Sequence, residues 1–215
     1  MALRYNPTKK PLALGTAELG VRLMNKRVPN EWTKLEFHDP EVVLPKLRKI
    51  REIISSSDTP EKIASLRTNK LKKERESWDA AVFCQLLSLT INRKIYFSCY
   101  ENSDFDSIFT WNDGGVQNYA PVQLKELVPE YTNSDASLDE ILNKLCKYSG
   151  KDDLIVGIKL NRKESFDLTN IPTQKLPICE LWMFGATSID QKYWSLFGEF
   201  MSGEAQQYEH ELQYV

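Results

Sequence analysis

Histidine and cysteine, which often supply catalytic bases, nucleophiles and metal ligands, are scarce in this sequence. Its only histidines, His38 and His210, are far apart along the chain. A Ser-His-Asp or Cys-His catalytic arrangement therefore has no local support. The cysteines are widely spaced, form no CxxC pair and lie in apolar contexts, at Cys84, Cys99, Cys146 and Cys179. This spacing favours buried free thiols over a zinc site.

Long apolar runs and a strong net charge are also missing. No run approaches the roughly 20 residues of a membrane span, and the N-terminal MALRYNPTKKPLALG has no apolar core long enough for a secretory signal. We therefore expect no membrane partner and a cytoplasmic location. The net charge of −2 lacks the basic excess that favours nucleic acid. It does not exclude a nuclease, because such an enzyme needs only a local basic groove.

Residues 1–67 are predicted to form a helical N-terminal region. A short helix is expected over 12–26 and another from Thr59-Pro60. Asp39 is a good N-cap for a helix that starts at Pro40 or, since proline interrupts helices, at Pro45. The remaining residues, 68–215, are predicted to form one α/β domain, which begins with an amphipathic helix over 68–89.

Three short strands are expected within residues 94–128. The run 94–100 is rich in β-formers, and the run 104–111 alternates acid and apolar residues before it becomes apolar. Asn112-Asp113-Gly114-Gly115 is a strong turn signal, so the chain should return as a hairpin over 118–128. Pro121 cannot donate a ladder hydrogen bond, so pairing is expected to start after it or at an edge.

The C-terminal half continues the alternation of helix and strand. A helix capped by Ser137 is expected over 137–149, followed by strands over 153–160 and 177–186. An aromatic-rich helix is expected over 190–201, and the last dozen residues are expected to be a polar tail. The predicted architecture is a mixed β-sheet with a helix on each face.

The hairpin carries the most specific chemistry of the chain. Gln123 and Lys125 should project to one face of their strand, and Asp104 and Asp106 should share a face of the neighbouring strand. Magnesium takes one or two carboxylates, water and substrate phosphate as ligands. Asp106 would supply a carboxylate and Gln123 a carbonyl oxygen. Lys125 would orient or deprotonate the attacking water and offset phosphorane charge.

At these residues the chain resembles the PD-(D/E)XK nuclease superfamily, and within it the Mrr-type restriction endonucleases, whose third motif is Gln-x-Lys. The family core is helix, three strands, helix, strand, and residues 70 to 160 match that order. The resemblance implies a restriction-endonuclease-like fold and a metal-dependent deoxyribonuclease that uses Mg²⁺ or Mn²⁺. Asp106, Gln123 and Lys125 match the motif, with Asp104 as the next choice for the acid.

The resemblance also implies further site residues and partners. Many members add an acid from the first helix, and here Glu76 or Asp79 would serve. DNA is the implied substrate, in defence against foreign DNA or in repair, and a homodimer would provide two active sites for duplex cleavage. The basic candidates for a groove that tracks phosphates are Lys70, Lys72, Lys73, Arg75, Arg93 and Lys94.

Other roles for these residues remain open. Lys125 and Gln123 could be the exposed side of an amphipathic strand, and Asp104 and Asp106 could cap a turn. Lys159 and Glu180, each within an apolar strand, would form a structural ion pair. The remaining large aromatic side chains are expected in the core or an interface: Trp78, Trp111, Trp182, Trp194, Phe184, Phe197 and Phe200.

Two other functions fit the same composition. The first is a non-catalytic protein-interaction module on a similar fold, with its partner surface on residues 178–201. The acidic balance and the aromatic-rich C-terminal half favour it. The second is a hydrolase of small phosphorylated molecules, which would cleave a model phosphodiester without binding duplex DNA.

Overall fold

The computed structural model describes residues 28–54, 67–100, 102, 104–148, 151–163, 167, 171, 173, 176–203 and 205–214. Over these residues the chain is an α/β protein in which N-terminal helices precede a seven-stranded mixed sheet. The helices predicted over 12–26 and from Thr59 lie outside the described residues, and the boundary at residue 67 stays a prediction. In the described part, no helix is long and apolar enough to cross a membrane.

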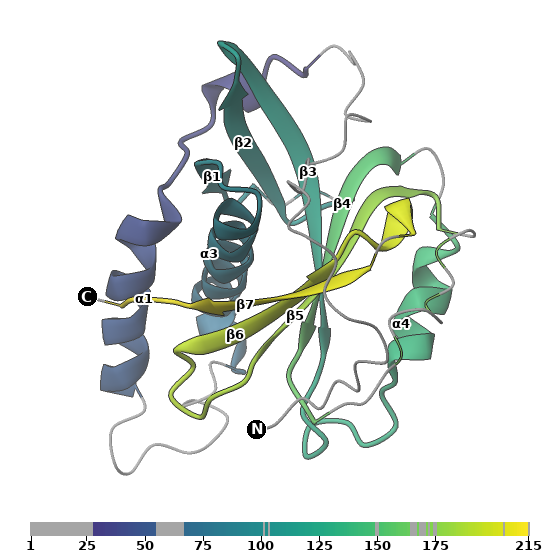
Figure 1. Ribbon diagram of the computed structural model, residues 1–215. Helices are drawn as coiled ribbons and strands as arrows, with labels where there is room; N and C mark the ends of the chain where they lie inside the picture. The colour runs from purple at the N-terminus through teal and green to yellow at the C-terminus, as the bar shows by residue number, and fades with distance from the viewer. Residues whose placement is uncertain are drawn as a thin grey trace.

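The sheet is ordered as the chain runs, from β1 to β7, and curls visibly across the molecule (Figure 1). The first three strands pair antiparallel, β3, β4 and β5 pair parallel, and the last three pair antiparallel. The strands are β1 (Ile95–Ser98), β2 (Ser107–Asp113), β3 (Val116–Leu127), β4 (Lys151–Leu160), β5 (Ile178–Ala186), β6 (Tyr193–Gly198) and β7 (Gln206–Glu211).

Three α-helices of the described chain cover the two faces of this sheet. α1 (Pro40–Ile54) begins at Pro40, where the Asp39 carboxylate accepts the Glu41 N–H at 3.0 Å, and it continues through Pro45. α3 (Lys72–Thr90) packs with α1 on one face. α4 (Leu138–Leu145), which Ser137 caps, packs on the other face (Figure 1). The predicted arrangement of a mixed sheet with helices on both faces is therefore confirmed.

Two C-terminal predictions are wrong. The segment predicted as a helix over 190–201 is the strand β6, followed by a 3₁₀ turn over Phe200–Ser202. The predicted polar tail contains β7, which pairs along the whole of β6. Both errors have a physical cause. The sequence of β6 is a short apolar run, and the spacing of apolar residues in so short a run fits a strand as well as a helix. The sequence of β7 is polar because this strand lies at the edge of the sheet.

The predictions for aromatic and proline residues fared better. The tryptophan and phenylalanine side chains expected in the core are all buried. Pairing of β3 with β2 runs through Pro121, opposite Ile108, while β4 joins β3 only from Val122 onward. At Pro121, therefore, the edge of β3 that later pairs with β4 is not yet paired. A missing backbone N–H is tolerated at such an unpaired edge.

The cysteine prediction holds in part. None of the four cysteines forms a disulfide, as predicted. Cys84 and Cys179 are buried, but Cys99 is exposed and Cys146 is half-buried.

Candidate functional site

The predicted site residues Asp106 and Gln123 meet on the β2–β3 hairpin. Asp106 comes directly before β2, and Gln123 is a buried residue of β3. The Gln123 side-chain amide donates a hydrogen bond to the Asp106 carboxylate. The same carboxylate oxygen accepts the backbone N–H of Leu124 at 2.8 Å. Asp106 therefore extends the contact between β2 and β3 past the last paired residues, Ser107 and Val122.

Lys125 shares a face of β3 with Gln123, as alternation along a strand requires. That face is opposite α3: Val122 and Leu124 point toward the core beneath α3, whereas Leu127 packs in the core beneath α4. The Lys125 side chain is half-buried. The structure thus brings Asp106 and Gln123 together and places Lys125 two residues along on the same face.

The two auxiliary acids occupy different surroundings. Asp104 is exposed in the turn before β2, where its N–H is 3.3 Å from the Asn102 side-chain oxygen. Glu76, on α3, forms an ion pair with Lys72 at 3.4 Å. The pKa of the Cys99 thiol is raised, first because neighbouring protein atoms partly desolvate it although the residue reaches the surface, and further because the Glu76 and Asp106 carboxylates are close. Glu76 and Asp106 therefore lie near the same end of the hairpin.

These residues are the right kind of donor for a hard divalent cation, although they are few. Asp106 offers a carboxylate and Gln123 an amide that can present its oxygen after a flip of the side chain. Among the described residues, no three His, Cys, Asp or Glu side chains cluster as a metal site. Because magnesium keeps several waters and takes oxygens of the substrate phosphate as ligands, two ligands from the protein are consistent with its usual coordination.

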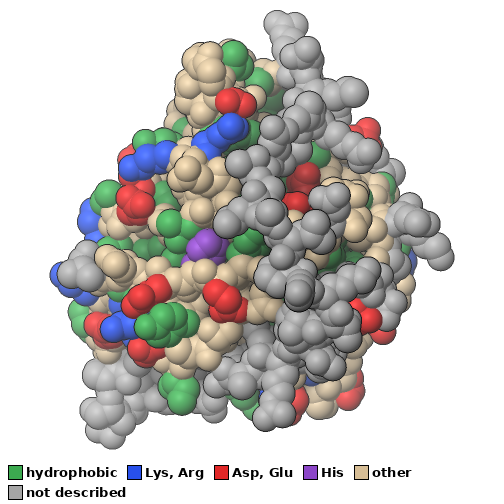
Figure 2. Space-filling view, viewed as in Figure 1, with side chains coloured by type: hydrophobic (Ala, Val, Ile, Leu, Met, Phe, Trp, Pro, Cys, Tyr) green, Lys and Arg blue, Asp and Glu red, His purple; other side chains and the backbone are tan. Residues whose placement is uncertain are grey.

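The basic candidates are spread over two places. Lys72 and Lys73 are exposed on the first turn of α3, and Arg75 lines a pocket beside that helix. Arg93 pairs with Asp113 at 3.1 Å near the hairpin turn, and Lys94 pairs with Asp39 at 2.7 Å. On the face drawn in Figure 2, acidic and basic side chains of the described residues are interspersed. On this side, the described residues form no groove lined by charges of one sign.

A second polar cluster lies on the other face of the sheet, beneath α3. Lys159 of β4 forms an ion pair at 2.6 Å with Asp79 of α3, and their side chains are only 10% and 12% exposed. The predicted pairing of Lys159 with Glu180 is wrong, because Lys159 lies opposite Phe184 while Glu180 lies opposite Ile155. The two positions are four residues apart along β5, with three residues between them.

Glu126 is the acid of this cluster that the sequence analysis missed. It lies opposite Lys159 in the β3–β4 pair, and its carboxylate accepts hydrogen bonds from Arg67 and, at 2.7 Å, from Asn161. Burial alone would raise the pKa of Glu126, but Lys159, Asn161 and Arg67 together hold it below its usual value. The sequence signal that could have identified this cluster is a charged residue in each of two neighbouring strands, Glu126 in β3 and Lys159 in β4.

Comparisons with known proteins were made at three levels: family models, curated proteins and solved structures. No protein-family model, curated protein or solved structure matches the chain.

Proposed function

We propose that this protein is a metal-dependent nuclease that hydrolyses phosphodiester bonds of DNA. The observation that carries the proposal is the contact between Asp106 and Gln123, with Lys125 two residues along on the same face of β3. A carboxylate, an amide oxygen and a lysine on one hairpin are the groups that the predicted reaction needs.

The order of elements supports a restriction-endonuclease-like fold. From α3 to β4 the chain runs helix, three strands, helix, strand, the order that the PD-(D/E)XK resemblance implies. In this arrangement the acid precedes the second strand of the series and the Gln-x-Lys pair lies within the third.

Each residue of the hairpin has a distinct role in the proposed reaction. Asp106 and Gln123 would hold Mg²⁺ or Mn²⁺, which lowers the pKa of bound water and polarises the phosphoryl oxygen. Lys125 would orient the attacking water and stabilise the negative charge that develops on the phosphate oxygens. Asp104 and Glu76, at the same end of the hairpin, are the auxiliary acids.

DNA contacts are proposed along the first turn of α3. Lys72 and Lys73 are exposed there and would bind backbone phosphates without reading sequence, with Arg75 and Arg93 as further candidates. A homodimer would bring two such hairpins to the two strands of a duplex. Defence against foreign DNA and DNA repair are the processes that such an activity would serve.

An interaction module remains the second candidate, with a smaller surface than the sequence indicates. Most of the aromatic side chains of β5 and β6 pack in the core. However, Ile189 on the turn between them is 93% exposed, and Tyr193, the first residue of β6, is 50% exposed. The turn and the start of β6 are the part of residues 178–201 that offers large apolar side chains to a partner.

The proposal is tested by incubating the purified protein with supercoiled plasmid and with single-stranded DNA, in Mg²⁺, Mn²⁺ or EDTA. We expect nicking that requires metal and that the Asp106→Asn variant loses. Absence of cleavage with both metals, together with no metal-induced rise in melting temperature, would contradict the proposal and favour the interaction module.

A further inference from the structure

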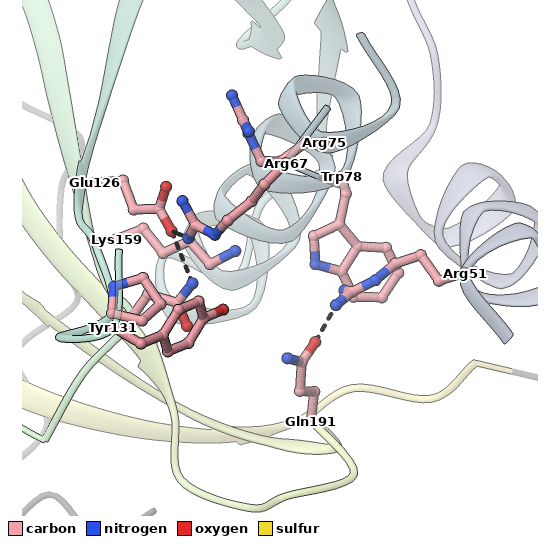
Figure 3. A pocket seen from close by; sticks show the side chains of 10 residues that line it. Arg51, Arg67, Arg75, Trp78, Glu126, Tyr131, Lys159 and Gln191 are labelled. Carbon is pink, nitrogen blue, oxygen red and sulfur yellow. Dashed lines mark hydrogen bonds and ion pairs between the residues drawn. The ribbon is translucent and has the colours of Figure 1, made fainter. Parts of the chain in front are cut away.

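A small cleft lies on the α3 face of the sheet, the face opposite to Gln123 and Lys125 of the proposed catalytic hairpin. Glu126, Lys159 and Asn161 line it at the carboxyl ends of the parallel strands β3 and β4 (Figure 3). Ligands of α/β proteins commonly bind at such strand ends. Its volume of about 260 Å³ is below the roughly 300–1,000 Å³ of pockets for drug-sized ligands, so the cleft suits a single small ring system.

The charges that line this cleft already have partners within the chain. The lining cations with such partners are Arg51, Arg67, Arg75 and Lys159. Glu126 forms an ion pair with Arg67, and Asp79 forms one with Lys159 at 2.6 Å. An anion in the cleft would lie close to the Glu126 carboxylate and would compete with it for the same cation. An uncharged ligand avoids this repulsion.

What the cleft lacks is hydrogen-bond acceptors. Trp78 is only 1% exposed, and its indole N–H finds no acceptor among the described residues. The same is true of the buried Nε–H of Arg67. Buried polar groups are nearly always hydrogen-bonded, so two unsatisfied donors that line one cleft indicate a ligand that supplies acceptors.

The packing of Trp78 determines which part of it a ligand can reach. The Arg51 guanidinium lies over its ring, 4.3 Å from the centre, and the Tyr214 ring packs against it with the centroids 5.5 Å apart. In Figure 3, the nitrogen of Trp78 is on the side of its ring that faces Lys159. Trp78 therefore offers its N–H edge, whereas Tyr131, which is 61% exposed and lines the same cleft, offers a ring on which a flat ligand could stack.

We propose that this cleft binds an uncharged, flat heterocycle that carries a ring carbonyl oxygen, the chemistry of a nucleobase. Carbonyl oxygens of the ring would accept from Trp78 Nε1 and Arg67 Nε, since each such oxygen has two lone pairs. Tyr131 would stack on the ring from the mouth of the cleft. This site requires no metal and does not depend on the proposed nuclease activity.

The test is the ¹⁵N–¹H NMR spectrum of the tryptophan indoles, recorded in EDTA with the full chain. The chain has five tryptophans, so five indole signals are expected, and the Trp78→Phe variant assigns the one from Trp78. We expect thymidine or inosine to shift that signal in a saturable manner. A Trp78 signal that neither nucleoside shifts would overturn the proposal.

A nucleoside without a ring carbonyl provides the ligand control. Purine riboside has no oxygen on its ring, so it should bind more weakly than the tighter of thymidine and inosine by about two- to tenfold, the usual effect of one hydrogen bond. Equilibrium dialysis with the unaltered protein measures these affinities. Purine riboside that binds as tightly as the better carbonyl nucleoside would contradict the assignment.

Substitution of one indole provides the protein control. Trp78→Phe keeps an aromatic ring but loses the donor, and it should weaken binding of the effective nucleoside by about two- to tenfold. Trp182→Phe is the matched control, because Trp182 is also buried with an unsatisfied indole N–H but does not line the cleft. It should bind as the unaltered protein does. Equal affinities for the two variants, both folded by circular dichroism, would contradict the assignment.

A second variant serves if Trp78→Phe does not fold. Arg67→Lys keeps a positive charge beside Glu126 but has no Nε–H donor, so it should also bind the effective nucleoside more weakly. A folded Arg67→Lys protein with the affinity of the unaltered protein would contradict a role of this donor.

Free nucleosides and bases within a DNA strand are the two sources of such a ring. A site for a base in a strand should bind a single-stranded oligonucleotide of the effective base more tightly than the nucleoside, and a site for the free nucleoside should show the reverse. Either order supports the cleft as a base site. An abasic oligonucleotide that shifts the Trp78 signal as strongly as the intact strand would contradict it.

Discussion

At the scale of single residues, Asp79 and Lys159 form an ion pair that is almost closed to solvent. It joins α3 to β4 across the sheet face, with the Lys159 ammonium 2.6 Å from the Asp79 carboxylate. A buried pair of this kind contributes little compared with apolar residues of the same size, but loss of one partner leaves the other charge buried and unpaired.

We therefore predict that Asp79→Asn lowers the free energy of unfolding by about 3–5 kcal/mol, measured by urea denaturation. The double variant Asp79→Leu with Lys159→Met should recover most of that loss, because neither member of the pair is then left buried without its partner. A single variant as stable as the unaltered protein would show that the pair is solvated in solution.

Glu126 gives a second residue-scale prediction, in the form of a pH dependence. Burial raises its pKa, yet Lys159, Asn161 and Arg67 outweigh burial and lower the pKa below its ordinary value of 4.5. The stabilisation that follows is present above the unfolded-state pKa and is lost as the pH falls through the folded-state pKa. Between about pH 6 and pH 3, the free energy of unfolding should fall less steeply in Glu126→Gln than in the unaltered protein. Parallel curves would contradict the linkage.

The residue contacts differ in how far the sequence could predict them. The meeting of Asp106 and Gln123 follows from a hairpin turn at Gly114-Gly115 and from counting back along both strands. The pair of Lys159 and Asp79 does not follow from any local pattern, because it depends on how α3 lies across the sheet. Only a charged residue within an apolar strand could have pointed to Lys159.

At the scale of elements, β5 and β6 pack closely where Gly198 of β6 lies against the ring of Trp182 of β5. A β-carbon added there would lie 1.8 Å from Cε3 of Trp182, whose ring is only 2% exposed. The indole is enclosed by the core and has little room to move, so overpacking cannot be relieved cheaply.

We predict that Gly198→Ala destabilises the protein by about 1–3 kcal/mol or more, measured as a shift in the urea midpoint. In a background of Trp182→Phe, which removes the ring atoms nearest to Gly198, the same substitution should cost less. An equal cost in both backgrounds would contradict the assigned cause.

β6 also shows why sequence patterns fail for some elements. Its apolar run of Trp194, Leu196 and Phe197 fits either a strand or a helix, and the choice is made by the strands on both sides. The helices α3 and α4 were predictable because their apolar residues recur with the period of an α-helix. In addition, α3 is long and α4 is capped by Ser137. β7 was missed because its composition resembles a tail.

At the scale of the whole molecule, one sheet separates two hydrophobic cores. Trp78, Trp182 and Trp194 lie in the core beneath α1 and α3, while Leu142 and Phe197 lie in the core beneath α4. Because β4 and β5 contribute side chains to both cores, the loss of one should remove the other.

We expect urea unfolding followed by tryptophan fluorescence and by far-ultraviolet circular dichroism to give one transition with the same midpoint. Fluorescence reports mainly the core beneath α3, whereas dichroism reports both helical layers. Two separate midpoints would show that the two sides of the sheet unfold independently.

At this scale we propose that the β2–β3 hairpin hydrolyses DNA through Lys125. The most direct measurement is the single-turnover rate of plasmid nicking in Mg²⁺ for the Lys125→Ala variant beside Lys147→Ala, which removes an exposed lysine after α4. We predict a rate lowered by about 10²–10⁴-fold for Lys125→Ala and an unchanged rate for Lys147→Ala. Full cleavage by a correctly folded Lys125→Ala protein would contradict the account.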